Sequence, residues 1–330
     1  MYTVKSRLKE QASLKNKKAA IIGVGALGSV TAQHLLRLGI GELRLIDRDI
    51  VELTNLGRQV LYTEADAHSR LPKAIAAQKR LQAINSSVRI SAHVQDANPA
   101  TIEELVKGCD LILDGTDNMR TRFLINDVSV KLNIPWIYGG AVASRGVVAC
   151  FLPGRTPCLR CMFHEPDELH GQTCDTIGVL GPLVHIVGSY QVLLAYHLLT
   201  GNEEACLSSL KHIDLWHHDV DELPRVFHPS CPCCQKGKYH FLDENIQESL
   251  IVQLCGRNSI QITPQQPVHL SFDVWMKRWK QLGEAKQTAY YVQLYYDGYR
   301  IVVFRDGRLL LEGVNNPEQA KQLYAKLIGA

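Results

Sequence analysis

The sequence has no excess of charge of one sign and no long uninterrupted apolar run. Its 36 basic and 33 acidic residues leave a net charge of +3, and no Lys/Arg run is interleaved with aromatic residues, so nucleic acid is not an expected partner. No apolar stretch follows the scattered basic residues of positions 1–18, which argues against a secretion signal and for a cytoplasmic protein. The longest apolar region, 177–199, is interrupted by Pro182, His185 and Gln191. It therefore predicts a buried helix, and no contact with a membrane is expected.

Short apolar strands alternate with helical segments over the first 140 residues. This alternation predicts an α/β fold with a Rossmann-like, doubly wound and mostly parallel sheet, which binds ligands at the carboxyl ends of its strands. Gly139, Gly140 and Gly146 surround the next apolar run, so the sheet is expected to continue into a mixed, antiparallel half. Strands are expected at 19–22, 43–46, 88–94, 111–113 and 136–138, and helices at 29–38, 73–84, 101–106 and 118–132.

A polar segment at 235–238 predicts a linker between two domains. We expect a large domain over 1–240, with a nucleotide-binding half over about 1–137 and a second half over 138–240, and a small α+β domain over 241–330. In the small domain, Asp297-Gly298 and Asp306-Gly307 predict hairpins, and Asn316-Pro317 predicts the start of a last helix. No role for this domain follows from its residues.

Gly23, Gly25 and Gly28 form a Gly-x-Gly-x-x-Gly motif between the first expected strand and helix. In this position backbone amides and the helix N-terminus can face phosphate. Asp47, 19 residues beyond Gly28 and at the end of the second strand, is placed to accept a ribose hydroxyl. Taken alone, these features fit an NAD-dependent dehydrogenase equally well.

A dense polar run favours the cleavage of ATP instead. Hydride transfer needs no such run, whereas cleavage at the α-phosphate develops charge that Arg, Lys and a divalent ion stabilise. Asp117 offers a carboxylate for that ion, the alternative being a plain helix N-cap. For Arg58 and Lys73 the alternative is a solvated surface charge. The run comprises Asp47-Arg48-Asp49, Thr54-Asn55-Leu56-Gly57-Arg58-Gln59, Lys73 and Asp114-Gly115-Thr116-Asp117-Asn118.

Two Cys-x-x-Cys pairs, Cys158/Cys161 and Cys231/Cys234, predict one tetrahedral zinc site with four thiolate ligands. Four ligands leave no open position for water, so the zinc is expected to be structural. Cys233 could compete as a ligand, but the spacing favours the outer two cysteines of its motif. Cys174 lies in a polar, glycine-flanked loop and is the candidate nucleophile, the alternative being an inert loop thiol.

These motifs, in this order, resemble the bacterial adenylyltransferases related to ubiquitin-activating enzymes, the ThiF/MoeB/HesA family, and most closely its Bacillus-type thiamine-biosynthesis members. The resemblance covers residues 11–240, and 304–308 look like the tail domain of longer members. It implies ATP-dependent adenylation of the C-terminal Gly-Gly carboxylate of a ubiquitin-like sulfur carrier, which prepares thiocarboxylate formation. The carrier is expected to serve thiazole synthesis, with a molybdopterin-synthase carrier as the alternative.

The resemblance also implies roles for residues and partners. Arg58, Lys73, Asp117 and Cys174 are the expected catalytic residues, with Cys174 carrying acyl or sulfur. Magnesium is an expected cofactor, and a cysteine desulfurase is an expected sulfur donor. A homodimer is implied, because in the family the arginine matching Arg58 reaches in from the other protomer. The expected nucleotide-binding residues are Gly23, Gly25, Gly28, Asp47, Asp49, Thr54, Asn55, Arg58, Gln59, Lys73, Asp117 and Asn118.

The sequence departs from the family in two places. The Arg-Tyr-x-Arg-Gln segment common near the start of family members is absent, with only Arg7 nearby, and Gly57 stands where Gln is common. These departures leave open the alternative of an inactive, zinc-stapled subunit that only binds the carrier.

Overall fold

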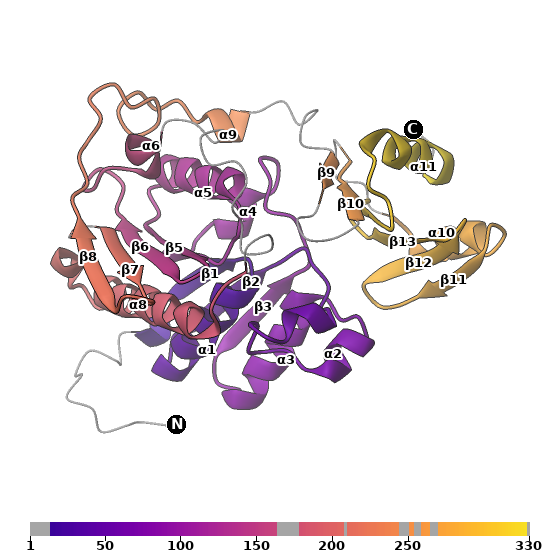
Figure 1. Cartoon of the computed structure of the whole chain (residues 1–330), viewed down its shortest axis with the longest axis horizontal. Coiled ribbons are helices and arrows are strands. Elements are labelled where there is room, and N and C mark those ends of the chain that lie inside the picture. Colours follow the sequence, from indigo (N-terminus) through magenta and orange to yellow (C-terminus); the bar gives the residue numbers. More distant parts are fainter. Residues whose placement is uncertain are drawn as a thin grey trace. The chain divides into compact units, whose positions relative to one another are not determined.

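The computed structural model describes residues 14–163, 178–207, 210–243, 251–253, 259–264 and 270–328. The chain divides into two units, Met1–Glu244 and Asn245–Ala330, and Figure 1 labels the elements of each. The first unit ends four residues beyond the predicted boundary, because helix α9 (His240–Asp243) packs on helix α5 (Met119–Leu132). The division of function between the units stays a prediction.

The first unit is built on an eight-stranded mixed sheet with the order β3-β2-β1-β4-β5-β6-β7-β8. The first five strands pair in parallel and the last three are antiparallel. The predicted α/β class and its change to an antiparallel half are therefore confirmed. The strands are β1 (Lys18–Ile22), β2 (Glu42–Ile46), β3 (Arg89–His93), β4 (Leu111–Asp114), β5 (Trp136–Val142), β6 (Arg145–Phe151), β7 (Leu210–Asp214) and β8 (Asp219–Leu223).

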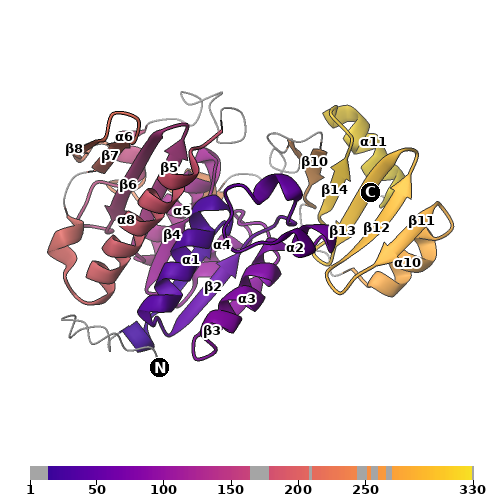
Figure 2. The same cartoon turned by 60° about the horizontal axis from the view of Figure 1, so that its bottom comes forward.

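Helices cover both faces of this sheet. One hydrophobic core lies between the sheet and α1 (Ala26–Leu38), α3 (Lys73–Ile84) and α8 (Gly181–Leu199), which stand in front of the strands in Figure 2. The other core lies under α4 (Ile102–Val106), α5 and the short helix α6 (Leu159–Met162). In the central strands β1 and β4, alternate residues enter opposite cores, as a sheet buried on both faces requires. Shorter elements are α2 (Glu64–His68) and the 3₁₀ turns η2 (Leu53–Asn55) and η4 (Glu203–Cys206).

Helix α8 accounts for the longest apolar region of the sequence. Pro182 stands in its first turn, where it starts the helix instead of interrupting it. By length and composition α8 could cross a membrane, but 56% of its apolar window is buried. It packs against α1, β5 and β6, which is typical of a core helix.

The second unit is a six-stranded antiparallel sheet with two helices on one face. The strand order is β11-β12-β13-β14-β10-β9, and the helices share one core with the sheet. Both predicted hairpins are present, and the last helix begins at Pro317 with Asn316 as its N-cap. The elements are β9 (Ile251–Gln253), β10 (Ser259–Ile262), α10 (Phe272–Trp279), β11 (Glu284–Gln287), β12 (Tyr291–Tyr296), β13 (Tyr299–Phe304), β14 (Leu309–Glu312) and α11 (Pro317–Leu327).

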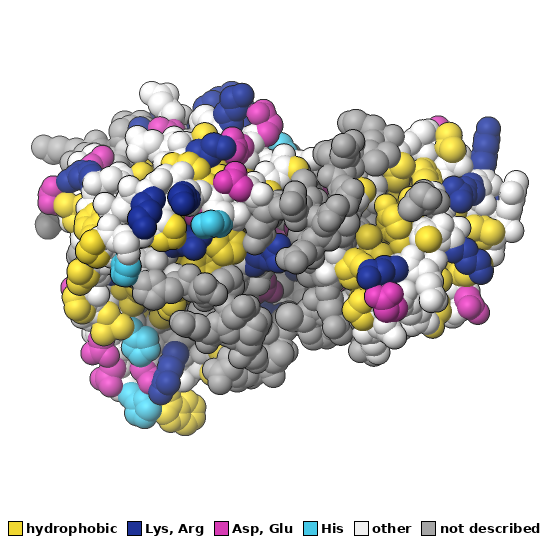
Figure 3. All heavy atoms as spheres, turned by 90° about the horizontal axis from the view of Figure 1, so that it is seen from above, with side chains coloured by type: hydrophobic (Ala, Val, Ile, Leu, Met, Phe, Trp, Pro, Cys, Tyr) yellow, Lys and Arg dark blue, Asp and Glu magenta, His cyan; other side chains and the backbone are white. Residues whose placement is uncertain are grey.

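The described surface mixes both signs of charge. On the face drawn in Figure 3, Lys and Arg side chains are interspersed with Asp and Glu, and no broad area of one sign stands out among the described residues. This pattern agrees with the nearly balanced composition.

Candidate functional site

The glycine motif forms a tight turn between β1 and α1. Gly23 has a φ of +82°. Its carbonyl oxygen would lie 1.9 Å from a Cβ added to Gly28 and 2.1 Å from a Cβ added to Gly115. Only glycine fits at these points of contact. Helix α1 then begins at Ala26 with no acidic side chain in its first turn and no side-chain cap. Its first amides are therefore available to phosphate.

Asp47 joins the glycine loop to the end of β2. Its Oδ2 accepts a hydrogen bond from Val24 N at 2.7 Å, and its Oδ1 accepts one from Asp49 N at 2.7 Å. Burial raises the pKa of Asp47, while the ammonium of Lys73 and the two amides oppose the rise. A carboxylate oxygen can accept more than one hydrogen bond. Asp47 can therefore still accept the ribose hydroxyl predicted from the sequence.

Lys73 opens α3 and is held by Asp49. Its Nζ lies 3.1 Å from Asp49 Oδ2, and its backbone N donates to Asp49 O at 2.8 Å. Lys73 is buried, and a buried ammonium requires a counter-charge, which Asp49 supplies. The alternative of a solvated surface charge is therefore wrong for Lys73.

Tyr62 supports the same region, although no sequence motif marks it. Its hydroxyl donates to Val24 O at 2.5 Å and lies 3.3 Å from Lys73 O. Burial raises the pKa of Tyr62 well above its usual value, and the carboxylates of Asp47 and Asp49 add to the rise. The hydroxyl thus stays protonated, and it ties the glycine loop to the first residue of α3.

Gln59 faces the glycine loop. A Cβ added to Gly25 would lie 3.7 Å from Gln59 Nε2, and the side chain of Gln59 is buried. Its Oε1 has no hydrogen-bond partner within the described part of the chain. A buried acceptor of this kind calls for a donor, which suits the predicted contact with a nucleotide.

The other predicted residues of this segment differ in exposure. Asn55 is buried, and its Oδ1 accepts from Glu52 N at 3.2 Å, so it stabilises the turn. Thr54 is exposed, and Arg58 is half-exposed with its Nη1 donating to Thr54 O at 3.1 Å. Gly57 has nothing near the position of an added Cβ, so the glutamine common in the family would meet open space there.

Asn118, not Asp117, caps helix α5. Asn118 Oδ1 accepts from Thr121 N at 2.9 Å, whereas Asp117 is exposed and its Oδ1 lies 3.3 Å from Asn118 Nδ2. The alternative of a helix cap is therefore wrong for Asp117. Its carboxylate is accessible just beyond the carboxyl end of β4, where it could bind a divalent ion. Asp114 of the same run is fully buried.

Arg122 ties the loop between β4 and α5 to strand β5, and it too was not predicted. Its Nε donates to Asp114 Oδ2 at 2.9 Å, and its Nη2 donates to Thr116 O at 2.8 Å and Gly139 O at 2.9 Å. Its guanidinium lies 4.8 Å from the ring centre of Tyr138. One buried side chain thus connects the loop before Asp117 to strand β5, which borders the antiparallel half of the sheet.

The structure brings the four predicted zinc ligands together. The sulfurs of Cys158, Cys161, Cys231 and Cys234 all lie within 4.8 Å of one another, and the pairs Cys158–Cys231 and Cys161–Cys234 are 3.6 and 3.5 Å apart. Tetrahedral ligation with Zn–S bonds of about 2.3 Å separates sulfurs by about 3.8 Å, so the donor set fits zinc. Cys233 is not part of this group.

Helix α5 is anchored to both segments that supply these cysteines. Asn126 Oδ1 accepts from Leu159 N at 2.8 Å, and its Nδ2 lies 3.4 Å from Cys233 Sγ. Asp127 Oδ2 accepts from Phe241 N at 3.0 Å. The middle of the helix that follows Asp117 and Asn118 is therefore joined to the segments that carry the four cysteines and to α9.

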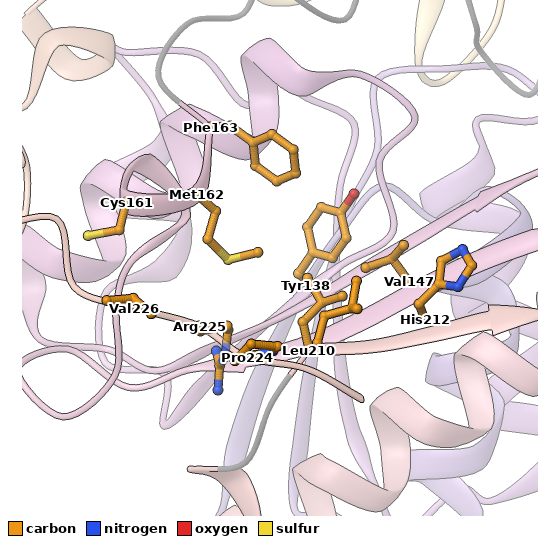
Figure 4. A pocket seen from close by; sticks show the side chains of 11 residues that line it. Tyr138, Val147, Cys161, Met162, Phe163, Leu210, His212, Pro224, Arg225 and Val226 are labelled. Carbon is orange, nitrogen blue, oxygen red and sulfur yellow. The ribbon is translucent and has the colours of Figure 1, made fainter. Parts of the chain in front are cut away.

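A cavity of about 500 Å³ opens beside this cluster. Figure 4 shows Met162 and Phe163, which follow Cys161, facing Tyr138 and Leu210 across it. The mostly apolar walls with a few polar groups are typical of a binding pocket. The lining residues are Tyr138, Val147, Cys161, Met162, Phe163, Leu210, His212, Leu223, Pro224, Arg225 and Val226.

Direct contacts bring two groups of the predicted residues together, whereas Thr54, Arg58, Asp117 and Asn118 belong to neither group. Direct contacts join the glycine loop, Asp47, Asp49 and Lys73 at the carboxyl ends of β1 and β2, and Gly115 packs on the loop from β4. The four cysteines form the second group. Cys174 and Arg7 lie outside the described residues.

Known proteins resemble this chain over most of its length. The model of the ThiF family matches residues 4–233. Sulfur carrier protein ThiS adenylyltransferase of Bacillus subtilis is 40% identical over 322 residues, which are 97% of this chain and 95% of that protein. Sulfur carrier protein adenylyltransferase of Thermus thermophilus is 36% identical over 254 residues, 74% of this chain and 90% of that protein. The crystal structure of E. coli MccB with ATP superposes with a TM-score of 0.60 at 25% identity, covering 68% of each chain.

Proposed function

The chain belongs to the ThiF family, and on that premise we propose that it is a sulfur-carrier adenylyltransferase. The C-terminal Gly-Gly carboxylate of a ubiquitin-like carrier attacks the α-phosphate of ATP, pyrophosphate leaves, and the carrier acyl-adenylate forms. Similarity to the ThiS adenylyltransferase of Bacillus subtilis extends through the second unit, which favours a ThiS-like carrier and thiamine thiazole synthesis. A molybdopterin-synthase carrier of MoaD type is the alternative.

The observation that carries this proposal is the contact of the glycine loop with Asp47 and of Asp49 with Lys73 at one edge of the sheet. In the proposed reaction the loop and the N-terminus of α1 bind phosphate, and Asp47 binds the ribose. Lys73 and Arg58 neutralise charge on the phosphoryl oxygens and on departing pyrophosphate. Asp117 and Asn118 would bind Mg²⁺ and phosphate, and the ion would supply further positive charge.

The carrier is proposed to bind over the second half of the first unit, at 138–240. The apolar cavity beside the cysteine cluster offers a site for an apolar anchor of the carrier. Arg122 contacts both Tyr138 in its wall and the loop before Asp117. This link supports a path for the carrier tail from the cavity to the nucleotide.

Further steps and partners are part of the same proposal. Cys174 carries the acyl or sulfur group after adenylation, and a cysteine desulfurase supplies the sulfur. A homodimer completes each site, with Arg58 reaching the partner's nucleotide. The half-exposed position of Arg58 supports this arrangement. Zinc in the cysteine cluster is structural, and the reaction takes place in the cytoplasm.

Carrier-dependent ATP–pyrophosphate exchange tests the function. The purified full chain is assayed alone, then with a ThiS-like and a MoaD-like carrier, with each carrier lacking its last two glycines as the matched control. We expect exchange with the intact ThiS-like carrier only. Exchange with the MoaD-like carrier alone would reassign the pathway. Binding of a carrier without exchange would identify the chain as the inactive, zinc-stapled subunit.

A further inference from the structure

Arg48 and Asp96 stand at the nucleotide site but have no role in the proposed reaction. Arg48 lies between Asp47 and Asp49 after β2, and Asp96 follows the neighbouring strand β3. Arg48 Nη1 is 3.0 Å from Asp96 Oδ1, and Arg48 Nε is 4.0 Å from Asp49 Oδ1. The other oxygen of Asp49 lies 3.1 Å from Lys73 Nζ. Four side chains of alternating charge, Asp96–Arg48–Asp49–Lys73, therefore form one chain, which we call the charge chain.

The charge chain is partly shielded from water. The side chains of Arg48, Asp96 and Asp49 are 25%, 18% and 26% exposed, and that of Lys73 is 6% exposed. Burial alone would lower the pKa of Arg48, but the carboxylates of Asp96, Asp49 and Asp117 more than reverse this effect. Charges at this depth interact more strongly than surface pairs. The charge that Asp49 presents to Lys73 therefore depends on the contact of Asp49 with Arg48.

Backbone contacts fix both ends of the charge chain. Asp49 N donates to Asp47 Oδ1 at 2.7 Å, and Asp49 O accepts from Lys73 N at 2.8 Å. At the other end, Thr101 Oγ1 donates to Asp96 O at 2.6 Å. Arg48 is the side chain that bridges these two fixed segments.

We propose that Arg48 is a positioning residue for Lys73, anchored by Asp96 and acting through Asp49. The proposal rests on the proposed function, because that function directs Lys73 to the phosphates of ATP. Arg48 lies beside Asp49 Oδ1, and Lys73 lies beside Asp49 Oδ2. The negative charge of Asp49 is therefore shared between two cations. Lys73 can then exchange Asp49 for a phosphoryl oxygen. Without Arg48, Asp49 holds the ammonium more tightly and the site gains a negative charge, which opposes a polyanionic nucleotide.

The test compares Arg48→Gln, Arg48→Lys, Asp96→Asn and the double variant Arg48→Gln/Asp96→Asn in carrier-dependent exchange. Arg48→Gln should lower kcat/KM for ATP by roughly tenfold or more, as expected when a close charge partner is lost. Arg48→Lys should recover part of that loss because it keeps the charge. Asp96→Asn should give a smaller loss, and no further loss in the Arg48→Gln background, because it acts only through Arg48.

The matched control is Lys17→Gln, which removes a partly buried pair at the opposite end of β1, where Lys17 Nζ is 3.2 Å from Asp110 Oδ1. It should leave exchange unchanged. Three outcomes would overturn the proposal. Arg48→Gln could be as active as the control, or the losses of the two single variants could multiply in the double variant. The third outcome is a loss of exchange that is explained by unfolding at the assay temperature. Calorimetric titration with ATP measures the effect of the charge chain on nucleotide binding without the exchange reaction. If the wild type shows no exchange, the proposed function is wrong. If the Kd for ATP is also the same in Arg48→Gln as in the wild type, the inference about Arg48 is wrong.

Discussion

Replacing Arg122 by glutamine should lower the free energy of unfolding of the first unit by about 3–5 kcal/mol, the usual result of removing one partner from a buried ion pair. Asp114 is fully buried and Arg122 nearly so. The change removes the 2.9 Å bond to Asp114 Oδ2 and the donors to Thr116 O and Gly139 O. The carboxylate of Asp114 would then keep only uncharged donors, the backbone N and hydroxyl of Thr116 and the backbone N of Gly139.

Scanning calorimetry measures this effect. For a unit of this size, about 2–4 °C is lost per kcal/mol, so the melting temperature should fall by about 6–20 °C. A second variant, Arg122→Gln/Asp114→Asn, replaces the unpaired charge by a neutral amide. It should recover a large part of the loss, because the dominant penalty is the unpaired charge and not the missing contact.

Arg145→Gln is the matched control, because it breaks a pair at the surface. Arg145 Nε lies 3.3 Å from Asp214 Oδ2, but its side chain is 68% exposed, and such pairs contribute about 0–1 kcal/mol. If Arg122→Gln lowers the melting temperature no more than Arg145→Gln, the pair with Asp114 does not hold the loop to β5. The structural role given to Arg122 would then be wrong.

Three further predictions concern the metal and the order of the chemical steps. Cys161→Ser should lose zinc, measured by metal analysis, and lower the melting temperature because structural zinc contributes folding free energy, whereas Cys233→Ser should keep a full equivalent. Asp117→Ala and Arg58→Ala should each abolish carrier-dependent exchange, and retained exchange in either would remove that residue from the catalytic set. Cys174→Ala should preserve exchange and impair only thiocarboxylate formation, followed by mass spectrometry of the carrier; a loss of exchange would contradict this division of roles.

Much of the fold was predictable because its elements are short and carry local signals. Helix α3 begins and ends where the sequence predicts, at Lys73 and Ile84, since Pro72 marks its start. Strand β5, in contrast, continues to Val142, well beyond the predicted end at Tyr138. From the sequence, Gly139 and Gly140 mark only the place where the period changes and the mixed half of the sheet is expected. In the structure Gly139 makes room for the side chain of Gln191, which would lie 2.5 Å from an added Cβ.

The site was predictable where its residues form a short motif with a fixed spacing in the sequence, as in the glycine loop and the cysteine pairs. It was not predictable where one side chain joins segments that are distant in sequence. Tyr62 reaches Val24, 38 residues away, and Asp127 reaches Phe241, 114 residues away. Neither residue stands in a pattern that sequence spacing reveals, because such contacts are decided by packing.

The cysteine cluster also sets an order of events during synthesis. Cys158 and Cys231 are 73 residues apart, so at a translation rate of 5–20 residues per second the first pair leaves the ribosome about 4–15 s before the second. During that interval all strands of the parallel half are already available to pair, but the cluster has only two of its four thiolates. The parallel half can therefore be assembled on the nascent chain before the four cysteines can join the segments at 158–161 and 231–234.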